Sequence, residues 1–174
     1  MIEQHNDSFD LEYFLTHEEG GMASYKEGLT TIKLLEFGDT YIKQVEPDYP
    51  RMVCTQTTFH HESLTLKEKG QYLKHSGVEI GVWNTYDDKG RLIKSEDMDE
   101  HFPITWVQLE AILEDRRISL LTVESIFRYY DKETDSSTWS IIIKLPMEKG
   151  RLYVFDARTG EIIHEEIIDM RKQR

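Results

Sequence analysis

Short runs rich in apolar and β-branched residues, each closed by a turn signal, recur along most of the 174-residue chain and constrain its fold more than any other feature. The clearest case is the pair of runs 31–37 and 40–45, which flank Gly38-Asp39. Two such runs around a two-residue Gly-Asp connection predict a β-hairpin. Pro47 and Pro50 follow it and predict its end.

The middle of the chain continues the same pattern. Residues 51–60 predict another strand. Residues 78–86 and 91–94 alternate apolar and polar positions on either side of a turn at 87–90, which predicts a second hairpin. This part of the chain is therefore expected to form an antiparallel β-meander.

Residues 1–28 look irregular and acidic, with a loop around Gly20-Gly21. Four apolar side chains in this segment are nonetheless available to dock on a core. They are Phe9, Leu11, Tyr13 and Phe14.

The pattern changes after Pro103. In residues 104–117 the apolar side chains recur at helical spacing, with Thr105 as the N-cap or, because of Pro103, a start one residue earlier. The side chains on the shared face are Trp106, Leu109, Ile112 and Leu113.

Four β-rich runs follow the predicted helix, at residues 120–130, 138–145, 151–155 and 161–165. The first also fits a helix, because Leu121, Ser125 and Tyr129 share a helical face; a strand is favoured. The predicted fold class is α+β: an N-terminal antiparallel β-meander, followed by a helix packed on a small antiparallel sheet. The predicted units are residues 1–100 and 101–174, either as two domains or as one packed body.

The formal net charge of −12 narrows the choice of partner. Most of the acidic excess lies in residues 1–100, and no basic run is present to neutralise phosphates, which argues against nucleic acid and anionic membranes as partners. A partner protein with a basic surface fits this charge. Acidity that serves only solubility fits it too.

The single cysteine, Cys54, excludes an intramolecular disulfide and is expected to be buried and inert in its strand. The N-terminus has neither a basic nor an apolar signal region, and no apolar run approaches the roughly 20 residues of a membrane span. A cytoplasmic protein is expected.

Residues 70–94 resemble a MORN-like hairpin repeat of the YwqK-type antitoxins. The matching elements are Gly70-Gln71-Tyr72, Gly81-Val82-Trp83, Tyr86-Asp87 and Gly90-Arg91-Leu92. Val78-Glu79-Ile80 departs from the pattern, and only one clear copy is present. A single copy must pack on something else, because such arrays need about three units to bury a core.

The C-terminal part resembles a PepSY-type unit. The resemblance rests on the predicted helix, on Trp139-Ser140-Ile141-Ile142, and on the turn Asp156-Ala157-Arg158-Thr159-Gly160. In such a turn Asp156 bonds backbone amides and Gly160 takes a positive φ.

A chain that combines these two units resembles the small immunity proteins encoded beside polymorphic or type VI secreted toxins. That resemblance implies a non-enzymatic protein that binds and neutralises a cognate toxin. A PepSY-type module that regulates a peptidase or an envelope protein is the alternative, and a hydrolase using Cys54 or a histidine is a third.

The acidic segment Glu96, Asp97, Asp99 and Glu100 is the candidate partner-binding site. A solvated linker is the competing interpretation of the same residues. His60-His61-Glu62 is expected to be surface, because neighbouring strand residues point to opposite faces and do not converge on a metal. Neither a phosphate-binding loop nor a dinucleotide fingerprint is present, so no cofactor, no metal and no catalytic residue is predicted.

Overall fold

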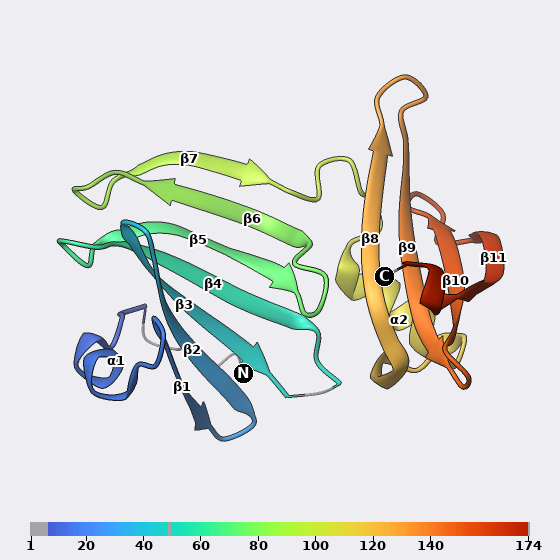
Figure 1. Ribbon diagram of the computed structural model, residues 1–174. Helices are drawn as coiled ribbons and strands as arrows, with labels where there is room; N and C mark the ends of the chain where they lie inside the picture. The colour runs from blue at the N-terminus through green and yellow to red at the C-terminus, as the bar shows by residue number, and fades with distance from the viewer. Residues whose placement is uncertain (1–6, 49, 174) are drawn as a thin grey trace. The chain divides into compact units, whose positions relative to one another are not determined.

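The computed structural model describes residues 7–48 and 50–173, and the chain divides into two compact units. The first unit runs to Tyr72 and includes Gly81–Asp97, and the second comprises Leu73–Ile80 and the chain from Met98 onward. A seven-stranded antiparallel sheet makes up most of the first unit, and a four-stranded antiparallel sheet lies in the second (Figure 1).

The strands of the larger sheet follow one another in chain order, so each pairs with its sequence neighbours. They are β1 (Met22–Glu27), β2 (Thr30–Phe37), β3 (Thr40–Pro47), β4 (Val53–His60), β5 (Leu66–Leu73), β6 (Glu79–Tyr86) and β7 (Leu92–Asp97). The predicted hairpins are confirmed: β2 pairs with β3 across Gly38-Asp39, and β6 pairs with β7 across the turn at 87–90.

One face of this sheet forms an aromatic core beneath α1 (Leu11–His17). The carboxylate of Asp10 caps the helix by accepting a hydrogen bond from the Tyr13 backbone N–H at 2.9 Å. The predicted docking of the N-terminal aromatic side chains is confirmed for Phe9 and Phe14, which are both buried. The buried members of this core are Phe9, Phe14, Ala23, Ile32, Leu34, Tyr41 and Phe59.

In the segment that resembles a MORN hairpin, Gly70 packs directly against the Trp83 ring. A Cβ on Gly70 would lie 2.1 Å from the Trp83 ring, so only glycine leaves room for the indole. The indole Nε1–H of Trp83 donates a hydrogen bond to the Gln71 carbonyl oxygen at 3.0 Å. Trp83 thereby supplies the apolar cover that Gly70 lacks.

The smaller sheet has the strand order β11-β10-β9-β8. Its strands are β8 (Val123–Asp131), β9 (Ser136–Leu145), β10 (Lys149–Asp156) and β11 (Ile162–Asp169). The helix α2 (Trp106–Asp115) precedes them, and the 3-10 helices η1 (Leu120–Thr122) and η2 (Met170–Gln173) flank the sheet in the chain.

The core of the second unit centres on Trp139 of β9, which is fully buried. Its ring centroid lies 6.1 Å from that of Trp106, and its Nε1–H donates to the Ile104 carbonyl oxygen at 2.9 Å. Leu109 and Leu113 of α2 are also fully buried, so the predicted apolar face of the helix is confirmed. Thr105 is the N-cap, as expected.

The turn after β10 has the predicted geometry. The Asp156 carboxylate accepts hydrogen bonds from the backbone N–H groups of Arg158 and Thr159 at 2.8 and 2.9 Å. Gly160 adopts φ +73°, and a Cβ there would lie 2.5 Å from Cδ1 of Ile112. Glycine is therefore required at this position for two reasons: the backbone has a positive φ, and no room is left for a Cβ.

The expected α+β class, with a helix on a small sheet as its second half, is wrong. The described residues form eleven strands and only two short α-helices, of seven and ten residues, so the protein is mostly β. The ends of the chain account for much of the difference. Met22–Glu27, expected to be irregular, is β1, and the last strand extends to Asp169 rather than ending at 165.

The two extra strand segments have weak sequence patterns, and both are edge strands. β1 pairs with β2 from Met22↔Leu35 to Glu27↔Thr30. A regular neighbouring strand supplies the hydrogen-bond ladder, so an edge segment can be extended without strong alternation of its own. The preference for a strand at 120–130 is confirmed for Val123–Asp131.

Candidate protein-binding surface

Glu96 and Asp97, the first half of the predicted acidic site, end strand β7 at the edge of the larger sheet. Both are exposed. Glu96 forms an ion pair with Lys94 at 2.6 Å, two residues back along the strand. This segment is therefore a paired strand and not a linker.

Glu100 and Asp99, the second half, belong to the second unit and lie in the turn that follows β7. Glu100 is exposed, whereas the Asp99 side chain is only 15% exposed and forms an ion pair with Arg128 at 2.7 Å. The Arg128 guanidinium, 13% exposed, also lies 4.6 Å from the centre of the Phe102 ring. Asp99 thus holds a cation that packs on an aromatic ring, a role in the interior of the second unit.

The apolar component of β7 was not anticipated from the sequence. Every residue of β7 is exposed, including Leu92 at 56% and Ile93 at 63%. Val82 on the neighbouring strand β6 is 52% exposed and lies opposite Asp97. The run Leu92-Ile93 directly after the turn was the available signal, but only the edge position of β7 makes it a surface feature.

A polar cluster lies on the other face of the larger sheet from the aromatic core. Lys33 of β2 and Glu46 of β3 form an ion pair at 2.7 Å, and the Tyr72 hydroxyl donates to the same Glu46 oxygen at 3.4 Å. Burial, with the nearby Cys54 and Glu46 side chains, raises the pKa of Tyr72 far above its ordinary value of 10.0. Its hydroxyl therefore stays protonated at neutral pH and acts as a donor, not as a base.

Cys54 is buried, as predicted. His60, the histidine that would activate it in a hydrolase, lies six residues further along the same strand β4. Six residues of extended strand span about 20 Å, far beyond hydrogen-bond reach. The geometry therefore rules out a Cys54–His60 nucleophile pair.

The neighbouring histidine, His61, is engaged elsewhere. Its Nε2 lies 2.9 Å from the Glu36 carboxylate, and its ring stacks on Tyr41 with 4.5 Å between centroids. Within residues 7–48 and 50–173, no group of three His, Cys, Asp or Glu side chains is arranged to hold a metal ion.

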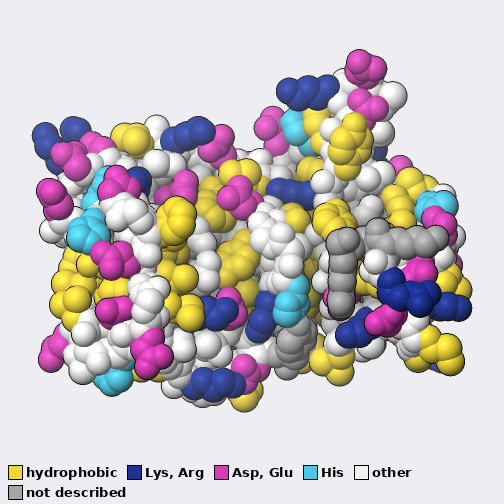
Figure 2. All heavy atoms as spheres, viewed as in Figure 1, with side chains coloured by type: hydrophobic (Ala, Val, Ile, Leu, Met, Phe, Trp, Pro, Cys, Tyr) yellow, Lys and Arg dark blue, Asp and Glu magenta, His cyan; other side chains and the backbone are white. Residues whose placement is uncertain are grey.

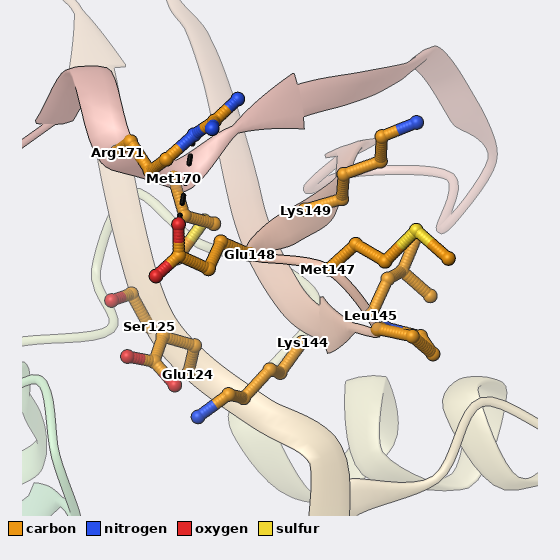
Figure 3. Close-up of a pocket in the computed structure, with 10 residues that line it drawn as sticks. Glu124, Ser125, Lys144, Leu145, Met147, Glu148, Lys149, Met170 and Arg171 are labelled. Atoms are coloured by element: carbon orange, nitrogen blue, oxygen red, sulfur yellow. Dashed lines mark ion pairs between the residues drawn. The ribbon is translucent and has the colours of Figure 1, made fainter.

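A shallow groove of about 760 Å³ opens in the second unit beside the β9–β10 turn (Figure 3). Its charged lining carries both signs: Glu124 and Glu148 against Lys144, Lys149 and Arg171. Glu148 and Arg171 face each other across it at 3.6 Å. This mixture gives the groove no preference for a ligand of one charge.

Charge over the molecule is similarly mixed. On the face drawn in Figure 2, acidic and basic side chains alternate among apolar ones without a continuous patch of one sign. Among the described acids, many have a basic partner, such as Asp48 with Lys26 at 2.9 Å and Asp87 with Arg91 at 2.7 Å. The edge strand β7 therefore remains the strongest candidate site because it combines exposed backbone, apolar side chains and acids.

No protein-family model matches this chain, and no curated protein is significantly similar to it. Among the described residues, no helix is both long enough and apolar enough to span a membrane.

Proposed function

We propose that this chain is an immunity protein that binds a cognate secreted antibacterial toxin in the cytoplasm and neutralises it without chemistry of its own. The observation that carries the proposal is the fully exposed edge strand β7. Its apolar residues Leu92 and Ile93 and its acids Glu96 and Asp97 are all exposed along this sheet edge, with neighbouring side chains on alternate faces.

An edge strand is suited to protein binding for a physical reason. It presents a row of backbone donors and acceptors that a partner strand can satisfy, while the side chains determine which partner fits. The acids at the end of β7 favour a partner with a basic surface, because complementary charge accelerates encounter and disfavours wrong partners. Exposed Leu92 and Ile93 add area that becomes buried on binding.

The choice of a toxin as the partner rests on the sequence resemblance to immunity proteins, and charge alone would not lead to it. The net charge of −12, most of it carried by residues 1–100, agrees with a basic catalytic domain as the target.

The direct test mixes the purified protein with the toxin domain encoded by the neighbouring gene. A stoichiometric complex of nanomolar affinity, together with rescue of growth when both are expressed, is the expected result. Absence of any complex between the two purified proteins would overturn the proposal.

Charge reversal on β7 tests whether this strand is the binding surface. Glu96→Lys with Asp97→Lys should slow association by about tenfold at low salt, and the difference should shrink as salt is raised. A control with the same change in net charge is Glu133→Lys with Glu161→Lys, two exposed acids of the second unit. If the control pair slows association as much as the β7 pair, the effect is one of net charge and β7 is not the binding site.

A further inference from the structure

One edge strand of the smaller sheet has a sequence that is nearly symmetric about its centre. Strand β11 is the edge strand next to β10, and most of its side chains are exposed. Read outward from Glu165, its residues are His164 and Glu166, then Ile163 and Ile167, then Ile162 and Ile168.

A strand with this order is complementary to a second copy of itself. In an antiparallel pair related by a two-fold axis through Glu165, each residue that lies n positions before the centre faces the residue n positions after it. Ile163 then faces Ile167 of the other copy, and His164 faces Glu166. Both contacts occur twice because of the symmetry.

The exposed apolar side chains of β11 favour this pairing. Ile163 and Ile167 are 57% and 56% exposed. Ile167 lies in the regular part of the β10–β11 ladder, opposite Arg151, and Ile163 lies at the β-bulge where the register shifts between Val154 and Phe155. Exposed β-branched side chains on a sheet edge promote strand-to-strand association, and here they flank the charged centre of the strand. Pairing the edges would bury all four isoleucines of the two copies in cross-strand contacts.

The charges oppose this arrangement only at its centre, where like charges lie directly opposite each other. The two central Glu165 side chains face each other, but each already lies 3.4 Å from Arg151 of its own β10. His164 lies 3.5 Å from Glu166 in the same strand, so a histidine and a carboxylate already alternate along this face. In the pair they would alternate across the strands as well.

We propose that the chain forms a symmetric dimer through β11, in which two four-stranded sheets join into one eight-stranded sheet. The contact is a single strand pair, so its area is small and the dimer is expected to dissociate in the micromolar range. This inference does not depend on the immunity function, because it uses β11 and not β7.

The experiment is sedimentation equilibrium of the full chain over a range of concentrations. The wild type should shift from monomer to dimer as concentration rises. Ile163→Glu and Ile167→Lys, made separately, should each weaken the dimer by about tenfold or more, because each change disturbs two symmetric contacts.

The double variant Ile163→Glu with Ile167→Lys is the decisive arm. The two-fold pairing sets each introduced acid opposite an introduced base of the other copy, so the dimer should recover. Within one chain the two positions are about 13 Å apart along the strand, too far for direct compensation. Circular dichroism checks that each variant is folded.

Ile93→Lys on β7 is the matched control, since it charges an equally exposed isoleucine on the edge of the other sheet. It should leave the dimer unchanged. The proposal is overturned if the wild type stays monomeric at all concentrations, if folded single variants dimerise like the wild type, if the double variant fails to recover, or if Ile93→Lys alone abolishes the dimer.

Discussion

Asp99 and Glu96 lie three residues apart in the sequence, yet their carboxylates have different surroundings. Asp99 is mostly buried and holds Arg128 against the Phe102 ring. Glu96 is about half exposed and pairs with the exposed Lys94. A buried pair leaves an uncompensated charge when one partner is removed, whereas an exposed pair is screened by water.

Asp99→Asn should therefore lower the free energy of unfolding by about 2 kcal/mol, because Arg128 loses its counter-charge in a mostly buried position. Glu96→Gln should change it by less than about 0.5 kcal/mol. Urea denaturation of both variants measures the difference. Equal effects at the two positions would contradict the assigned role of Asp99.

The four acids of the predicted site differ in how far their sequence neighbours reveal their surroundings. Composition and local order identified Glu96, Asp97 and Glu100 as surface acids, because nothing nearby in the sequence offers to bury them. Asp99 looked the same, since its partner Arg128 lies 29 residues away and is brought to it only by the folding of the second unit.

At the scale of elements, the β9–β10 turn is conformationally strained. Met147 and Glu148, the last two residues of the three-residue connection that begins with Pro146, have φ values of +62° and +55°. This is the left-handed region, which Asn and Gly adopt at lower cost than other residues. Neither residue is of the favoured type.

Replacing Met147 with Asn and Glu148 with Gly should stabilise the protein by about 1 kcal/mol, because the strained turn is relieved. Thermal unfolding of the double variant measures this as a rise in the melting temperature. Glu148→Gln is the control: it removes only the exposed ion pair with Arg171 and should leave the melting temperature nearly unchanged. A double variant no more stable than this control would show that the turn stores no strain.

Element prediction succeeded where the signal was local. The helix at 106–115 was marked by its apolar spacing and its N-cap, and the hairpins by their turn residues. The prediction failed at β1 and at the second half of β11, because those segments owe their extended form to the ladder of a neighbouring strand and not to their own alternation.

At the scale of the whole molecule, turn aspartates link stability to pH. Hydrogen bonds from nearby backbone and side-chain donors lower the pKa of Asp87, Asp131, Asp135, Asp156 and Asp169 below the ordinary value of 3.8. A lowered pKa in the folded state gives stability that is fully present above the unfolded value and is lost as pH falls through the folded value. The protein should therefore lose stability below about pH 4.

Asp156→Asn tests this linkage at one turn, because the amide oxygen can still accept from Arg158 and Thr159 but carries no charge. The variant should be less stable than the wild type at pH 7, and the gap should close as pH falls below 3.8. Denaturation midpoints between neutral and acidic pH measure it. Parallel curves for the two proteins would contradict a contribution from Asp156.

The sequence alone determined the properties that depend on neighbouring residues. Turn residues and alternation specified the hairpins, and helical spacing specified α2. Only the tertiary structure decided that strands dominate, that Asp99 is enclosed by a distant arginine, and that β7 and β11 are sheet edges. Edge position and burial depend on which segments lie beside each other in space, and a linear pattern does not contain that information.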